Sequence, residues 1–210
     1  MTIIDISRTL SPGIAVWPGD TPFQIQRTLS RGEGHSVNLT TLTLSAHTGS
    51  HVDAPLHFTD AGASLDQVDL TPFWGPAQVV TVAGRSGVLQ PDDLHAYDLS
   101  LAPRLLLRSS ASDLDPGQFP QDYVYPSPAL AAHLKQAGVI LLGSDAPSMD
   151  HVDSQDLPGH NALLRHGIAI LEGLDLSQAP DGVYELSALP LKIGGGDGSP
   201  VRAALRPLSS

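Results

Sequence analysis

Short apolar runs separated by turns dominate the pattern of hydrophobic and polar positions along this chain. Alternation of apolar and polar residues, or enrichment in β-branched residues, is typical of strands. Proline and glycine are spread throughout the sequence and indicate many turns between short elements. The stretches that predict strands are 3–6, 37–46, 77–82, 105–108, 139–142, 168–171, 183–192 and 201–205.

Helix signals are fewer. Ser127 followed by proline is typical of an N-cap with proline at the first helical position, and predicts a helix over 128–136 that stops at a nearby glycine. A second helix is predicted to begin near Pro91. The first helix lies between the apolar stretches 105–108 and 139–142, so we expect a strand–helix–strand unit there.

The pattern as a whole predicts a single α/β domain over residues 1–210, built mainly on a mixed sheet with few helices. The length fits one ordinary domain with a sizeable core. Hydrophobic residues make up 41% of the chain and charged residues 16%, which is enough apolar material to exclude disorder.

No apolar run approaches the length of a membrane span, and the N-terminus lacks the basic and apolar regions of a signal peptide. We therefore expect no membrane partner and a cytoplasmic location. Cysteine is absent, which excludes disulfides and thiolate metal sites and fits a reducing compartment.

The formal net charge of −11 bears on whether the protein binds nucleic acid. Proteins that bind nucleic acid neutralise phosphates with clustered lysine and arginine. Here only 11 such residues are scattered among 22 acidic ones, so we expect no nucleic-acid partner. Bound metal would neutralise some of the carboxylates.

The candidate chemistry concentrates in the segment 47–57, with the sequence HTGSHVDAPLH. His47, His51, Asp53 and His57 all have odd numbers, and alternate side chains of an extended chain point to one face. A glycine and a proline in the segment indicate a strand that runs into a shaped loop. Packing these groups without a metal would leave several polar atoms needing partners. Imidazole and carboxylate without thiolate suit Zn²⁺, Mn²⁺ or Fe²⁺.

A further carboxylate, Glu172, ends the apolar stretch 168–171. An unpaired buried charge is expensive, so either a metal binds this carboxylate, or it faces solvent or pairs with Arg165. The residues leave these alternatives open. His160 and His166 lie nearby, and spacing does not choose between them as ligands.

Several other features allow two interpretations. Trp17, in a turn-rich stretch, either stacks a flat ligand or covers the edge of the core. The glycine-rich segment 194–200 lacks the lysine and helix of a P-loop, so we expect a flexible or closely packed loop. No Gly-x-Ser-x-Gly motif supports a serine nucleophile.

A second polar cluster either lies on the surface or lines the same pocket. It consists of Asp145, Asp150, His151 and Asp153.

The segment 47–57 resembles the signature of the metal-dependent cyclase family, to which bacterial formamidases belong. The length fits the short formamidase branch, and one mild departure is Ser50, where the family often has threonine. Both residues carry a hydroxyl, so this difference puts little in doubt. Further similarity is found at 5–7, 17–23, 143–148, 165–173, 189–192 and 199–203.

The resemblance implies a fold of the swivelling β/β/α type and a homodimer whose active site is helped by the partner subunit. It implies that His47 and His51 bind one metal ion and that Asp53 and Glu172 bridge two divalent ions. His160 corresponds to the ligand of the second ion, which selects it over the other histidine. Zinc is the expected metal, with manganese as the alternative.

The resemblance also implies that His57 is the general acid/base and that Trp17 contacts the ring of a small aromatic amide. The implied reaction is the hydrolysis of N-formyl-L-kynurenine to L-kynurenine and formate in tryptophan degradation. A related hydrolase acting on isatin or another small aromatic amide is one alternative. A non-catalytic metal-binding module is another, although it would not need an acid/base histidine. Candidates for binding the substrate's amino-acid end are Arg31, Arg165 and Arg202.

Overall fold

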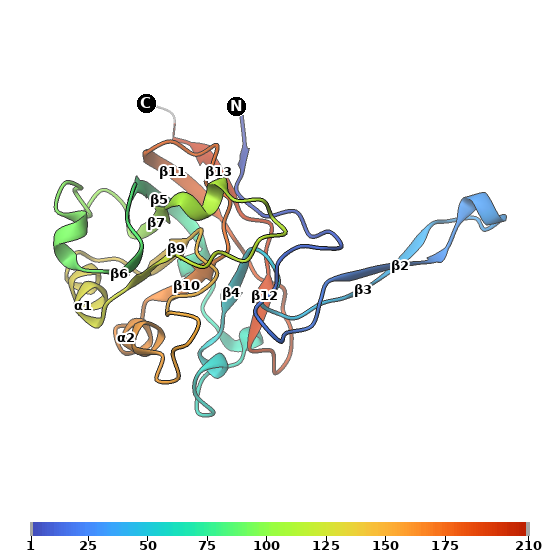
Figure 1. Ribbon diagram of the computed structural model, residues 1–210, viewed down its shortest axis with the longest axis horizontal. Helices are drawn as coiled ribbons and strands as arrows, with labels where there is room; N and C mark the ends of the chain where they lie inside the picture. The colour runs from blue at the N-terminus through green and yellow to red at the C-terminus, as the bar shows by residue number, and fades with distance from the viewer. Residues whose placement is uncertain (1, 209–210) are drawn as a thin grey trace.

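The computed structural model, which describes residues 2–208, is built on one nine-stranded sheet that curls on itself (Figure 1). The strand order is β1-β13-β11-β5-β7-β9-β10-β4-β12. The strands of this sheet are β1 (Ile4–Asp5), β4 (His51–Asp53), β5 (Trp74–Thr81), β7 (Arg104–Arg108), β9 (Leu141–Ser144), β10 (Ala169–Glu172), β11 (Gly182–Ser187), β12 (Gly198–Pro200) and β13 (Ala204–Pro207). The predicted α/β class with a mixed sheet is confirmed.

The centre of the sheet, β5-β7-β9-β10, is parallel, and the strands on both sides pair antiparallel. Parallel strands are buried on both faces, and β7 illustrates this. Leu105 and Leu107 join the core on the helical face, whereas Leu106 joins the core on the opposite face. The sheet therefore separates two apolar cores.

Two helices, α1 (Pro128–Gln136) and α2 (Pro158–Arg165), pack on the same face of the sheet (Figure 1). The α1 prediction is confirmed, and Ser127 caps the helix by accepting a hydrogen bond from the Leu130 amide. The flanking strands β7 and β9 pair in parallel, as expected for a strand–helix–strand unit. Helix α2 was not predicted, because its short sequence includes glycine and asparagine, which are poor helix formers.

Other predicted bounds differ from the structure. The stretch 183–192 ends as a strand at Ser187, and 201–205 begins after β12 has ended and enters a strand, β13, only at Ala204. The predicted second helix is only a 3-10 turn, Pro91–Leu94. A small parallel pair, β6 (Gly87–Leu89) and β8 (Val124–Pro126), was not predicted, because three residues show too little periodicity.

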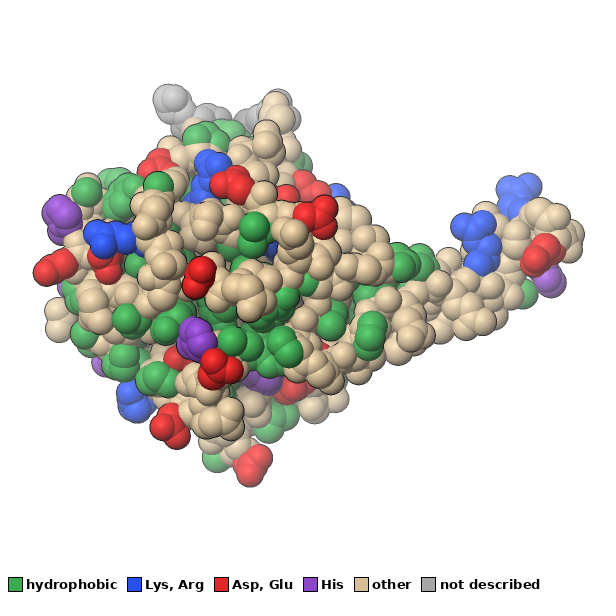
Figure 2. Space-filling model, viewed as in Figure 1, with side chains coloured by type: hydrophobic (Ala, Val, Ile, Leu, Met, Phe, Trp, Pro, Cys, Tyr) green, Lys and Arg blue, Asp and Glu red, His purple; other side chains and the backbone are tan. Residues whose placement is uncertain are grey.

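A hairpin arm, formed by β2 (Gln24–Leu29) and β3 (Leu39–Thr43), projects away from the body (Figures 1 and 2). The predicted strand 37–46 therefore exists in shortened form, but it does not join the main sheet. Ile25 and Leu42 lie opposite each other on the arm, and each is about half exposed. A two-stranded hairpin alone is marginally stable in water, so the arm is a candidate for contact with another chain.

Among residues 2–208, no helix is both long and apolar enough to cross a membrane.

Candidate metal centre and active site

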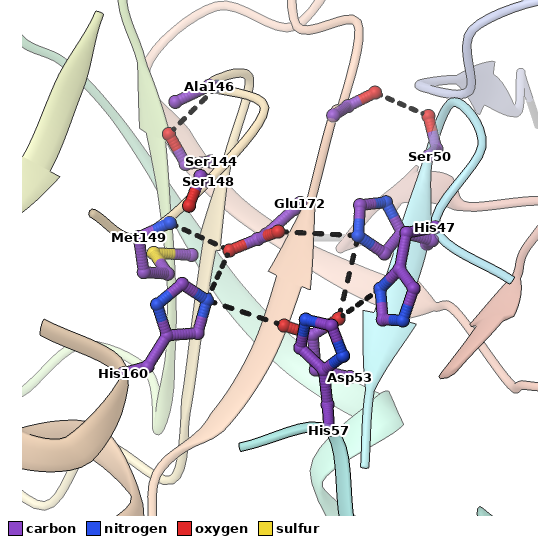
Figure 3. Close-up of polar contacts among 12 residues, drawn as sticks. His47, Ser50, Asp53, His57, Ser144, Ala146, Ser148, Met149, His160 and Glu172 are labelled. Carbon is purple, nitrogen blue, oxygen red and sulfur yellow. Dashed lines mark hydrogen bonds and ion pairs between the residues drawn. The ribbon is translucent and has the colours of Figure 1, made fainter. Parts of the chain in front are cut away.

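The pairing of β4 with β10 builds the centre of the site. His51 lies opposite Glu172 in the antiparallel register, and Asp53 is two residues further along β4. Because cross-strand partners and alternate residues share a face, all three side chains point to the same side (Figure 3). The sequence prediction that His51 and Asp53 face one way is consistent with this geometry.

His47 and His57 reach the site differently. His47 lies in the turn before β4, and His57 ends the 3-10 turn Pro55–His57. The predicted strand that runs into a shaped loop is therefore short: only His51 and Asp53 lie on it, and turns bring the two outer histidines to the site. His47 Nδ1 is 2.9 Å from Asp53 Oδ1, and the two histidine ring centroids are 3.9 Å apart.

The two buried carboxylates lie between His51 and His160. His51 Nε2 is 3.3 Å from Glu172 Oε2 and 3.5 Å from Asp53 Oδ1. On the other side, His160 Nε2 is 3.3 Å from Glu172 Oε1 and 3.6 Å from Asp53 Oδ2. Each carboxylate therefore presents one oxygen to each imidazole (Figure 3). Glu172 faces neither solvent nor Arg165, the alternatives that the sequence left open.

Hydrogen bonds behind the site fix the orientation of both imidazoles. His51 Nδ1 donates to the Gly49 carbonyl oxygen at 2.9 Å, and His160 Nδ1 donates to Asp150 Oδ2 at 2.7 Å. Because each Nδ1 carries a proton, loss of the second ring proton would leave the Nε2 lone pair directed toward the carboxylates. Such outer partners set the tautomer and basicity of metal-binding histidines.

The second polar cluster is divided between two roles. Asp150 supports His160 from within the fold, whereas Asp145 accepts hydrogen bonds from two serines. His151 and Asp153 are exposed. Sequence reasoning placed Asp150 in the cluster without assigning this role, and its ten-residue separation from His160 gave no periodic signal.

Burial and close contacts between carboxylates and imidazoles shift the pKa values of several groups in the cluster. Burial opposes ionisation of Asp53, but the neighbouring imidazoles of His160 and His47 lower its pKa well below the usual range. Burial likewise opposes protonation of His160, but Asp150, Asp53 and Glu172 raise its pKa to about 12. For His47, burial is outweighed by Asp53 and then Asp197, which raise its pKa to about 9. In the metal-free protein these histidines hold protons at neutral pH.

Metal affinity is therefore expected to rise with pH between neutrality and about pH 9, because ligation requires neutral imidazole. A proton held by His47 below its pKa must leave before the ring can bind an ion. Calorimetric titration of the metal-free protein with Zn²⁺, in two buffers of different ionisation enthalpy, would count the released protons. An affinity that does not change with pH would contradict this assignment.

The residues fit a divalent metal. Asp53 Oδ2 is buried and accepts no hydrogen bond within residues 2–208, which is costly unless another group binds it. Ligand atoms of His51, Asp53 and Glu172 lie within 4.8 Å of one another, as do those of His47, Asp53 and His57. This set of nitrogen and carboxylate donors suits zinc or manganese.

Asp197 is a site residue that the sequence did not reveal. Its Oδ2 lies 3.2 Å from His47 Nε2 and 3.4 Å from His57 Nδ1. The glycine-rich loop is closely packed here, since a Cβ on Gly198 would lie 2.6 Å from a His47 ring carbon. The requirement for glycine at this point was the one available signal, but 140 residues separate Asp197 from His57.

An open cavity of about 360 Å³ lies over the cluster. Trp17 lines it and meets Phe119 edge to face, with ring centroids 5.5 Å apart. Phe119 was not singled out in the sequence. Among the described residues, the cavity lining includes His47, His51, His57, His160 and Glu172, but neither His166 nor any of the three arginines proposed for the substrate's amino-acid end.

The start of α2 approaches the loop at Met149 so closely that position 159 has no room for a side chain. A Cβ on Gly159 would lie 2.1 Å from the Met149 carbonyl oxygen, so Gly159→Ala must displace the start of α2 and His160 with it. We expect a loss of about 1–3 kcal/mol in unfolding free energy and weaker metal retention, measured by denaturation and elemental analysis. Gly194→Ala, with no atom within 4 Å of the new Cβ, should change neither property.

Fold and site together define an α/β protein with a buried histidine–carboxylate centre under an open cavity. The family model described as "Putative cyclase" matches residues 4–151. The kynurenine formamidase of Salinibacter ruber is 49% identical over 207 residues, covering 98% of each chain. The chain belongs to this cyclase family.

Two solved structures share the fold. One, described as a potential metal-dependent hydrolase with cyclase activity, has a TM-score of 0.83 at 26% identity and covers 97% of this chain and 96% of that chain. The other, isatin hydrolase A from Ralstonia solanacearum, has a TM-score of 0.81 at 26% identity and covers 98% and 92%.

Proposed function

We propose that the protein is a metal-dependent amide hydrolase that converts N-formyl-L-kynurenine to L-kynurenine and formate. The observation that carries this proposal is the pair of buried carboxylates, Asp53 and Glu172, each shared between the imidazoles of His51 and His160. The near full-length similarity to a kynurenine formamidase supports the choice of substrate.

We assign the ligands of two divalent ions, zinc first and manganese second. His47 and His51 would hold one ion, His160 the other, and Asp53 and Glu172 would bridge them. The two-sided arrangement of carboxylate oxygens supports this assignment, because each carboxylate already offers one oxygen to either side. Bound ions of this kind lower the pKa of water to about 7 and polarise a carbonyl oxygen.

Besides bound metal, the reaction requires a proton donor and a contact that positions the substrate, and residues of this chain could provide both. His57, whose side chain is about one-third exposed beside the cluster, would donate a proton to the aniline nitrogen as the bond from that nitrogen to the formyl carbon breaks. Asp197, near His57 Nδ1, would orient the ring so that its other nitrogen faces the cavity. Trp17, supported by Phe119, would hold the aromatic ring of the substrate in place.

Isatin or another small aromatic amide is the second candidate substrate, because an isatin hydrolase has the same fold over 98% of this chain. The hydrolytic chemistry would be the same, and only the fit of the cavity would differ. Parallel turnover measurements with isatin and N-formyl-L-kynurenine would separate the two substrates.

Kynurenine release from N-formyl-L-kynurenine tests the main proposal. Activity should disappear after treatment with a chelator and return when Zn²⁺ or Mn²⁺ is added. A folded, metal-loaded protein with no turnover would contradict the formamidase assignment. Turnover that survives complete metal removal would contradict the role of the metal.

We further propose that the protein forms a homodimer through the β2–β3 arm. The arm exposes apolar side chains that a monomer would leave in water, including Ile25, Leu39 and Leu42. Exposed apolar groups gathered on one projecting element are typical of a surface that contacts another chain.

The dimer proposal predicts that Ile25→Asp combined with Leu42→Asp converts the protein to a monomer, because both changes place charge on one face of the arm. Light scattering coupled to size-exclusion chromatography would give the mass. Gln26→Asp lies on the opposite face of the hairpin and should leave the mass unchanged. A double variant that remains a dimer would show that the arm does not hold the subunits together.

A further inference from the structure

One guanidinium lies in the wall of the cavity. Among the described residues that line it, Arg8 is the only lysine or arginine, whereas Asp20, Asp145 and Glu172 supply acidic groups. Arg8 is partly buried and follows β1 after a few residues. It is neither a proposed metal ligand nor the proposed proton donor.

Hydrogen bonds hold Arg8 at both ends. Its backbone amide donates to Ser50 Oγ at 2.9 Å, and that hydroxyl donates to the Gly173 carbonyl oxygen at 2.7 Å. Its Nη2 donates to the backbone carbonyl oxygens of Ala111 at 2.9 Å and Asp145 at 3.4 Å. The guanidinium is therefore fixed relative to the residues that flank the metal ligands.

The charge of Arg8 is not neutralised by a neighbouring carboxylate. Asp145 turns its carboxylate toward Ser109 and Ser112, which donate four hydrogen bonds to it from their amides and hydroxyls. Within residues 2–208 Arg8 forms no ion pair, and its Nε and Nη1 donate no hydrogen bond. A fixed guanidinium with free donors can bind a carboxylate through two hydrogen bonds.

We propose that Arg8 binds the α-carboxylate of the substrate and so makes the enzyme prefer aryl formamides that carry an amino-acid side chain. The inference rests on the proposed formamidase function and names the group that recognises the far end of the substrate. It replaces the earlier candidates: Arg202 pairs with Asp5 at the surface, Arg31 begins a 3-10 turn on the arm, and Arg165 ends α2.

Two substrates with the same scissile bond isolate this role. In the metal-loaded enzyme, Arg8→Gln should lower kcat/KM for N-formyl-L-kynurenine by about 10- to 100-fold, mainly through KM, because charge-assisted hydrogen bonds are lost. Hydrolysis of formanilide, which lacks the amino-acid side chain, should be unchanged. Arg165→Gln and Arg202→Gln should leave both substrates unaffected, and thermal unfolding would verify that each variant is folded.

Binding gives a second readout that does not depend on turnover. By calorimetry, Arg8→Gln should weaken binding of L-kynurenine by a similar factor and leave ortho-aminoacetophenone, which lacks the amino-acid end, unchanged. An equal loss for both compounds, or no loss for either, would overturn the assignment. So would a selective loss in Arg31→Gln alone, which would place the anchor on the arm. Failure of the wild type to hydrolyse N-formyl-L-kynurenine would instead contradict the proposed function.

Discussion

Asp53→Asn is expected to abolish metal retention and activity together. Both oxygens of Asp53 face imidazoles, one toward His47 and His51 and the other toward His160, so this carboxylate is central to the cluster. Asparagine keeps the shape but removes the negative charge and replaces one acceptor by a donor. The remaining histidines would then face an amide that does not neutralise a divalent ion.

The expected loss in kcat/KM is at least about 10³-fold, in line with the several kcal/mol that a catalytic metal supplies. Elemental analysis of the purified variant should show bound metal well below that of the wild type. Asp92→Asn removes an exposed carboxylate on a 3-10 turn and should retain both metal and activity. Normal metal content with full turnover in Asp53→Asn would refute the assignment of Asp53 as a bridging ligand.

His57→Ala is expected to keep the metal and lose most of the turnover. His57 is the most exposed histidine of the site and lies next to Asp197, which suits a group that exchanges protons with a substrate. General acid catalysis is typically worth about 10²–10⁴-fold, so kcat should fall by that factor while KM changes little. Kinetics and elemental analysis on the same preparation would separate the two properties.

A matched control for this experiment is His133→Ala, on the exposed side of α1, which should leave turnover and metal content unchanged. His57 also belongs to one of the two groups of residues that could bind a metal ion, so it could be a ligand instead of the proton donor. Loss of metal together with turnover in His57→Ala would make it a ligand, and full activity would remove it from the chemistry.

Local signals gave reliable predictions where neighbouring residues interact. The cap at Ser127 and the apolar pattern behind it predict α1, because both act within one turn of helix. The two-residue period likewise predicts that His51 and Asp53 share a face. Helix α2 escaped prediction because packing of the loop around Gly159, rather than propensity, holds it in place.

Partners from distant segments could not be predicted in this way. Asp150 fixes His160, and Asp197 approaches His57 from the far end of the chain. Aspartates are frequent in this sequence, and neither the polar cluster around Asp150 nor the glycine-rich loop around Asp197 indicates which histidine each would contact. Arg8 was overlooked for the same reason, since its place in the cavity wall depends on hydrogen bonds to three separate segments.

The sequence alone determined the donor atoms: a histidine- and aspartate-rich segment, a carboxylate at the end of an apolar stretch, and no thiolate to compete. These features depend only on residues close together in the chain, so they can be recognised without knowing the fold. The tertiary structure decided which groups meet: the β4–β10 register placed His51 opposite Glu172, and α2 brought His160 to the other side. The β4–β10 register joins segments more than 100 residues apart, and the position of α2 depends on packing against residues outside the helix, so no local pattern carries either.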